Sequence, residues 1–117
     1  MSIDYLGEKI FQEEIQAAGQ LWILRGAHKN IYAVEVEEGG WSLPVWSSRE
    51  KAAEFLQNAR LIGQKYVPEA IALNLFTQAW LSDKMMAIVE LQINPHGKSS
   101  RVLVLTSEEF RAGQPPP

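Results

Sequence analysis

Cysteine is absent from the 117 residues. That absence excludes disulfides, thiol nucleophiles and zinc sites built on cysteine. It also fits a reducing compartment, and the N-terminus lacks the basic segment and apolar run of a signal peptide. No apolar run approaches the roughly 20 residues that a membrane-spanning helix needs. We therefore expect a cytoplasmic protein that does not associate with membranes.

Histidine and aspartate are also scarce. The two histidines, His28 and His96, lie in predicted turns, and the only aspartates are Asp4 and Asp83. A histidine in a turn is usually exposed, and it serves as an acid or base only when a partner orients it. No His-Glu-x-x-His spacing is present. We predict no metal site, no cofactor and no catalytic residues.

Basic residues are few and scattered, and the net charge is -3. Nucleic-acid binding requires a concentrated patch of Lys and Arg that displaces counterions from phosphates. The nearest approach to such a patch in the sequence is Lys98 with Arg101. Only convergence in space would supply another, from Arg25, Lys29, Arg49 and Arg60. We expect no nucleic-acid partner.

Apolar residues make up 46% of the chain, which is enough to form a real core. The length suits one compact domain. We assign residues 1–111 to a single α+β domain and residues 112–117, which end in three prolines, to a disordered or extended tail.

The most informative stretch runs from Trp41 to Phe55 and predicts a strand, a sharp stop and a capped helix. Leu43 and Val45 alternate with polar or turn-forming neighbours, as a pleated strand requires. Pro44 cannot donate to a ladder, so the strand is an edge or is bulged there. Ser47 and the glutamate three residues later have the spacing of a capping box. The helix therefore starts at Ser47.

Periodicity and turn residues predict the remaining elements. Helices are expected over 5–18, 48–62 and 74–81, with Asn74 as a cap and a last helical turn capped by Thr106 and Glu109. Strands are expected over 21–25, 31–36, 41–46, 70–73, 85–93 and 101–105. The first three would form an antiparallel meander, and strand 21–25 would be covered on both faces. The fold class is α+β, with an antiparallel or mixed sheet of about five to six strands and two to three helices packed as a two-layer sandwich.

Four segments carry a resemblance to a known family. They are Leu43-Pro44-Val45-Trp46-Ser47-Ser48-Arg49-Glu50, the preceding Gln20-Leu21-Trp22-Ile23-Leu24, the later Phe76…Trp80-Leu81, and Ile93-Asn94-Pro95. In order and spacing the chain resembles the bacterial Domain of Unknown Function 2750 family from about Phe11 to Phe110. It is more loosely similar to the enhanced-serine-sensitivity proteins. The segment from Met85 to Ile93 is longer and more apolar than the family pattern. The resemblance implies a fold but no activity and no catalytic residues.

The four tryptophans fit a core, but Trp46 falls on the strand face opposite Leu43 and Val45. If no helix covers that face, Trp46, Pro44 and Trp41 form an exposed aromatic patch, which is typical of interaction surfaces. Our first hypothesis is therefore a non-enzymatic interaction or regulatory module with an unknown protein partner. Such a module could be a monomer or a homodimer.

The alternative is a small-ligand domain that holds an anion at the N-terminus of the helix starting at Ser47. Free backbone N–H groups at a helix N-terminus favour an anion, so the candidate residues are Ser47, Ser48 and Arg49. An enzyme is a special case of this alternative. Ser47 and Ser48 occupy a strand-to-helix turn, but the glycines of a Gly-x-Ser-x-Gly nucleophile elbow are absent.

Overall fold

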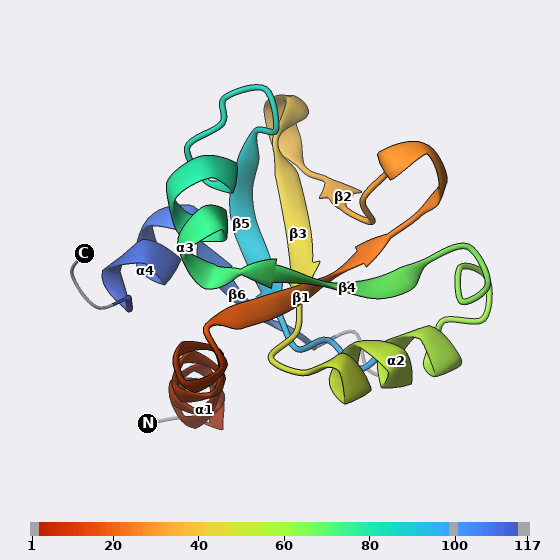
Figure 1. Ribbon diagram of the computed structural model, residues 1–117, viewed down its shortest axis with the longest axis horizontal. Coiled ribbons are helices and arrows are strands. Elements are labelled where there is room, and N and C mark those ends of the chain that lie inside the picture. Colours follow the sequence, from red (N-terminus) through yellow and green to blue (C-terminus); the bar gives the residue numbers. More distant parts are fainter. Residues whose placement is uncertain (1–2, 99–100, 115–117) are drawn as a thin grey trace.

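The computed structural model describes residues 3–98 and 101–114, and within these ranges the chain forms six strands in two sheets (Figure 1). The strands are β1 Gln20–Arg25, β2 Val34–Glu35, β3 Trp41–Val45, β4 Val67–Ala72, β5 Ile88–Ile93 and β6 Leu103–Thr106. The α-helices are α1 Ile3–Ala18, α2 Arg49–Asn58, α3 Leu73–Leu75 and α4 Ser107–Ala112, and a π-helix over Phe76–Trp80 continues α3. The predicted α+β class is confirmed.

One sheet has four strands in the order β2-β3-β5-β6 and the other is the ribbon β1-β4. The larger sheet is mixed, because β3 and β5 run parallel while the other neighbours are antiparallel. In Figure 1 the β1–β4 ribbon crosses in front of the larger sheet. A bridge between Trp22 and Trp46 joins the two sheets.

The predicted meander of the first three strands is wrong. β1 pairs along its whole length with β4, and it touches the returning segment only at the bridge between Arg25 and Ile31. The strand expected over 31–36 is reduced to Val34–Glu35, which pairs with the start of β3. β1 and β3 belong to different sheets, so the segment between them cannot pair along its length with both, and it pairs with β3. At Pro44 the ladder from β2 has already ended, as expected of a residue without an N–H.

The two faces of β1 enter two separate apolar clusters. Leu21 and Ile23 lie in the main core between the sheets, while Trp22 and Leu24 pack in a second cluster with Trp46. The prediction that this strand is covered on both faces is therefore confirmed. The main core also takes side chains from α1, the π-helix and α4, namely Phe11, Ile15, Phe76 and Phe110.

The strand expected over 85–93 begins only at Ile88. Trp41 pairs with Ile88 and Ser42 with Glu90, so Val89 is an extra residue in a bulge. The bulge shifts the side-chain alternation, which buries Ile88 and leaves Val89 46% exposed. Val89 was expected on the same face as Leu91 and Ile93, and the bulge explains why that expectation is wrong.

The helix ends follow the sequence in part. Gly19 at φ 71° follows α1, and Thr106 with Glu109 forms the predicted capping box of α4. The helix expected over 48–62 stops at Asn58, and Asn74 does not cap the next helix, whose N-cap is Ala72. Of the tail expected over 112–117, Ala112 ends α4, Gln114 bonds to Gln12, and residues 115–117 lie outside the described residues.

Candidate functional site

The strand-to-helix stretch and the Asn94-Pro95 turn, which are far apart in sequence, meet in the fold. Asn94 adopts a left-handed backbone at φ 49°, and its N–H donates to the carbonyl of Val45 over 2.9 Å. Its side-chain oxygen accepts the N–H of Ser47 at 2.9 Å. These bonds fix the point at which β3 ends and α2 begins. We call this region the junction.

Trp46 lies inside the junction and not on the surface. Its side chain is 0% exposed, and its indole Nε1 donates to the carbonyl oxygen of Pro95 at 2.7 Å. Phe55 of α2 covers it with a ring-centroid distance of 5.2 Å. The sequence placed Trp46 on the correct strand face, but α2 and β1 close that face. The exposed patch expected from Trp46 and Pro44 is therefore a wrong prediction, since Pro44 is buried as well.

The hydroxyl of Ser47 is used in a contact between helices. Ser47 Oγ donates to Glu14 Oε1 of α1 at 2.6 Å, and Lys51 Nζ lies 2.9 Å from the same oxygen. The hydrogen bond from Ser47, together with the bond and charge of Lys51, lowers the pKa of Glu14 against a small opposing effect of burial. Ser47 is only 6% exposed, so this hydroxyl is not presented to a substrate. The group joins α1 to the start of α2.

The three residues of the predicted anion site, Ser47, Ser48 and Arg49, have different roles in the structure. The helix N-cap is Ser48, not Ser47, because Ser48 Oγ accepts the N–H of Lys51 at 3.2 Å and α2 starts at Arg49. The capping box predicted for Ser47 and Glu50 is therefore wrong: the cap lies one residue later, and Lys51 three residues after it has no acceptor to complete a box. Arg49 is exposed, and Glu14 already places a carboxylate beside Ser47 and Lys51. Binding of an external anion here stays a prediction.

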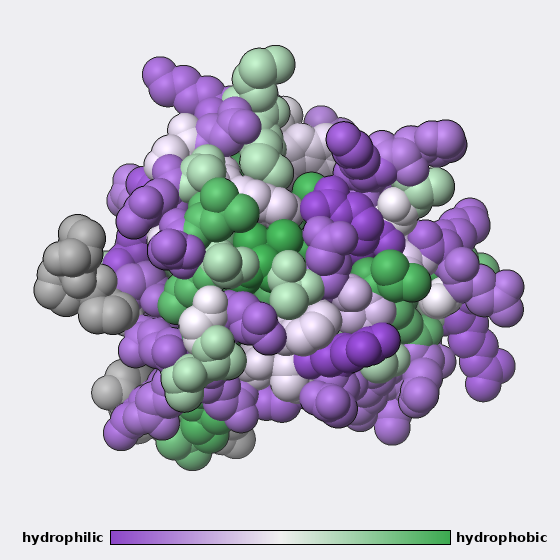
Figure 2. Space-filling model, in the orientation of Figure 1, coloured by the Kyte–Doolittle hydropathy of each residue, from purple (hydrophilic) through white to green (hydrophobic). Residues whose placement is uncertain are grey.

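Trp41, the third residue of the predicted patch, lines a groove that sequence reasoning did not identify. We call it the Trp41 groove. It has a volume of about 270 Å³, and all of its lining residues are apolar: Ile31, Ala33, Trp41, Leu43, Met85, Met86 and Ile88. Trp41 is 37% exposed and Met85 is 94% exposed. In Figure 2 apolar side chains gather over the upper ends of β3 and β5, with polar side chains around them.

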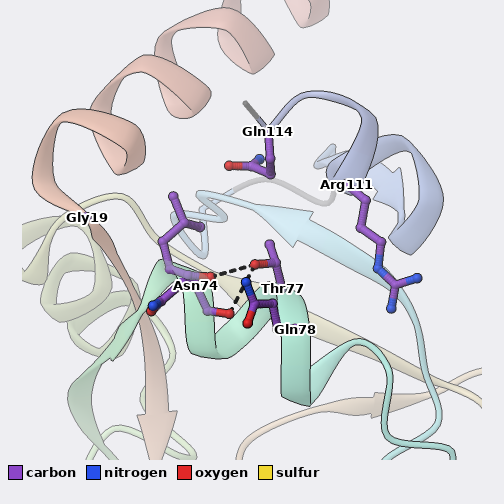
Figure 3. Close-up of a pocket in the computed structure, with 7 residues that line it drawn as sticks. Gly19, Asn74, Thr77, Gln78, Arg111 and Gln114 are labelled. Atoms are coloured by element: carbon purple, nitrogen blue, oxygen red, sulfur yellow. Dashed lines mark hydrogen bonds between the residues drawn. The ribbon is translucent and has the colours of Figure 1, made fainter. Parts of the chain in front are cut away.

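A second hollow lies between the end of α1, the α3–π-helix segment and α4 (Figure 3). Its volume is about 590 Å³, and it is lined by Gly19, Leu73, Asn74, Thr77, Gln78, Arg111 and Gln114. We call it the α3–α4 cavity. Sequence reasoning missed it because its walls come from three separate segments, and the spacing within each segment carries no sign of the others.

The last features to place are the possible metal-ligating side chains and the two histidines. Within residues 3–98 and 101–114, no group of three or more His, Asp or Glu side chains could hold a metal ion. His28 and His96 are both exposed, in separate turns. No helix among the same residues is both long and apolar enough to cross a bilayer.

These features define a class, a small α+β domain in which the junction ties the end of β3 to the turn after β5, and whose surface includes the Trp41 groove and the α3–α4 cavity. The chain belongs to the family described as Protein of unknown function (DUF2750), whose model matches residues 9–112. No curated protein matches the sequence. Among solved structures the chain is similar to Anabaena Tic22, a protein described by its role in protein transport, with 13% identity and a TM-score of 0.45. The match covers 93% of this chain and 50% of the Tic22 chain.

Proposed function

We propose that this domain is a non-enzymatic binding module whose contact surface is the Trp41 groove. The observation that carries the proposal is that every residue lining that groove is apolar, and that one of them, Met85, is 94% exposed. An exposed apolar hollow on a folded domain is typical of a docking surface. Methionine suits such a surface because its flexible, polarisable side chain adapts to different apolar partners.

The fold gives the groove a firm base. Trp41 and Leu43 are two residues apart on β3, so they share one strand face. Leu43 and Ile88 belong to the main core, and the N–H of Trp41 donates to the carbonyl of Ala87 at 2.9 Å. The walls are therefore held before a partner arrives, which reduces the entropy lost on binding. The partner in this proposal is a protein that inserts one or two apolar side chains.

We include in the proposal a place of action in the bacterial cytoplasm, which fits the lack of cysteine. The junction contains a serine and a lysine, the residue types of a nucleophile and a base, but their contacts favour a structural role over catalysis. Ser47 is buried and its proton is donated to Glu14. Lys51 Nζ lies 2.9 Å from the same carboxylate, so both side chains are engaged within the protein.

The test is affinity capture with three forms of the full chain: wild type, Met85→Asp and Leu61→Asp. Leu61 is the matched control, because it is 93% exposed but does not line the Trp41 groove. Both substitutions replace an exposed apolar side chain by the same charge, so neither is expected to change the urea midpoint. We expect a stoichiometric protein with wild type and Leu61→Asp that is lost with Met85→Asp. Capture that survives Met85→Asp, or that both variants lose equally, contradicts the proposal.

A further inference from the structure

The α3–α4 cavity has the dimensions and lining of a small-molecule site. Pockets for small ligands have volumes of roughly 300–1,000 Å³ and combine apolar walls with a few polar groups. This cavity has about 590 Å³, with Leu73 as its apolar wall and five polar or charged residues around it. In Figure 3 Arg111 and Gln114 extend from the α4 side, and Asn74, Thr77 and Gln78 come from the opposite side.

The charged group at this cavity is Arg111, and its charge is not neutralised within the described residues. The ion pairs in residues 3–98 and 101–114 join Arg25 to Glu69 and Lys51 to Glu14. Arg111 makes one side-chain hydrogen bond, to Ser82 Oγ at 3.2 Å. A guanidinium carries five N–H donors in a planar fork that matches a carboxylate. Most of that donor capacity is therefore available to an anionic ligand.

The facing residues add further donors. Asn74 Oδ1 accepts the N–H of Leu75 at 2.8 Å, which leaves the Nδ2 donors of Asn74 for another acceptor. Gln78 is exposed, and its amide has no hydrogen-bond partner in the parts of the chain that the structure describes. Thr77 adds none, because its hydroxyl donates to the carbonyls of Leu73 and Asn74 within the helix. The polar groups left around the cavity therefore favour an acceptor-rich ligand.

Two further observations concern the walls. Gly19 has φ 71°, and a Cβ placed on it would meet nothing within 4 Å, so the cavity is open beside the end of α1. On the α4 side, the amide nitrogen of Gln114 donates to Gln12 Oε1 at 2.6 Å and to the carbonyl of Phe110. Gln114 Oε1 and Gln12 Nε2 are nonetheless buried without a partner. Gln114 Oε1 is itself an acceptor and does not bind a carboxylate, and Gln12 does not line the cavity, so neither of these atoms takes part in the ligand contacts.

We infer that the α3–α4 cavity binds a small aliphatic carboxylate. The carboxylate lies on the Arg111 guanidinium, and the aliphatic body lies over Leu73 and the open space beside Gly19. The π-helix over Phe76–Trp80 supports this assignment, since π-helical turns are rare and frequent at functional sites. The site is independent of the Trp41 groove.

The test is an NMR titration of the full chain, followed through backbone amide shifts, with hexanoate as the probe. Hexanamide keeps the body and removes the charge, and acetate keeps the charge and removes most of the body. We expect saturable shifts at Thr77 and Gln78 with hexanoate, and affinity at least about fivefold weaker with either of the other two probes. Equal affinity for hexanoate and hexanamide overturns the carboxylate assignment.

Three variants locate the site. Arg111→Gln removes the charge and should weaken hexanoate binding at least about fivefold. Gln78→Trp changes an exposed residue, so the fold should persist, and the indole should fill the cavity and abolish binding. Arg60→Gln is the matched control, an exposed arginine that does not line this cavity, and should leave the affinity unchanged. Binding that persists in both cavity variants, binding lost in Arg60→Gln, or no saturable shift in wild type overturns the inference.

Discussion

The indole Nε1–H of Trp46 donates to the carbonyl oxygen of Pro95 across 2.7 Å, in a fully buried position. This bond ties the end of β3 to the turn that follows β5. Two stretches 49 residues apart in the sequence thereby become one structural unit. The junction fixes the direction in which α2 leaves the sheet. It also buries Trp46, the side chain that the sequence predicted as part of a contact surface.

Trp46→Phe tests the importance of this bond. The substitution keeps an aromatic ring but leaves the Pro95 carbonyl without a donor and opens a small void. We expect the free energy of unfolding to fall by about 2 kcal/mol, because an unsatisfied buried acceptor alone costs about 1–3 kcal/mol. Urea denaturation measures the change. Trp41→Phe is the matched control and should cost less than about 0.5 kcal/mol at its partly exposed site. Equal losses for the two variants would show that the bond contributes nothing.

Asn94 serves the junction in two ways that substitutions can separate. Its side chain accepts the N–H of Ser47, and its backbone has φ 49°, where a Cβ is strained. Asn94→Gly removes the hydrogen bond but tolerates the backbone, so we expect a loss of about 1 kcal/mol. Asn94→Ala removes the bond and keeps the strain, so the loss should be about 1 kcal/mol larger. Thermal or urea unfolding measures both, and a less stable glycine variant would contradict this account.

Glu14 should make stability depend on pH. The hydrogen bond from Ser47 and the contact with Lys51 hold the pKa of Glu14 below its ordinary value of 4.5. The folded state therefore binds this proton less readily than the unfolded chain does. The contribution is fully present above pH 4.5 and is lost as the pH falls through the lowered pKa. The side chain is 44% exposed, so solvent screening limits the contribution to less than about 1 kcal/mol.

Urea unfolding of wild type and Glu14→Gln between neutral and acidic pH measures this contribution. The stability difference between the two should be constant near neutral pH and should shrink in acid. Glu13→Gln, at an exposed neighbour on the same helix, is the control for the general effect of removing one carboxylate. A difference between wild type and Glu14→Gln that does not change with pH would rule out ionisation of Glu14 as its source.

The position of Glu14 also leads to a prediction for anions. Its carboxylate occupies the place beside Ser47 Oγ and Lys51 Nζ that an external anion would take. Glu14→Ala should free that place, so inorganic phosphate should raise the melting temperature of this variant more than that of wild type. Glu13→Ala controls for the general effect of salt. If phosphate stabilises wild type equally well, and Arg49→Gln abolishes that effect, the anion site predicted from the sequence exists in the native protein.

Local patterns predicted local structure well. The capping box of Thr106 and Glu109, the glycine after α1 and the two covered faces of β1 are all visible in the sequence, because each depends on residues a few positions apart. The pairing of β1 with β4 and the parallel pairing of β3 with β5 depend on tertiary packing. Periodicity assigns a side chain to a face but does not say what covers that face. Trp46 was therefore placed correctly on its strand and wrongly at the surface.

The candidate sites were less predictable than the fold. Trp41 was selected from the sequence and does line a groove, but Met85 and Met86 were assigned to a strand when they lie in a turn before it. Asp83 holds that turn, since its carbonyl accepts the N–H of Ala87 and its side chain accepts the N–H of Met85, and neither bond has a signal in the apolar pattern. The α3–α4 cavity was not predicted at all, because its polar residues are ordinary surface residues until the fold brings them together.

The turn before β5 offers a substitution that should stabilise the protein. Ala87 has φ 51°, a left-handed conformation that a Cβ makes unfavourable by about 1–2 kcal/mol. Ala87→Gly relieves that strain but adds freedom to the unfolded chain, so we expect a net gain of about 0.5 kcal/mol. Gly39→Ala makes the opposite change at φ 77°, where an added Cβ meets nothing within 4 Å, and should cost about 1 kcal/mol through strain alone. Urea denaturation of both variants compares the two signs. The Trp41 N–H donates to the Ala87 carbonyl, and the substitution leaves this bond in place. A loss of stability in Ala87→Gly would therefore mean that the added freedom of the unfolded chain outweighs the relief of strain.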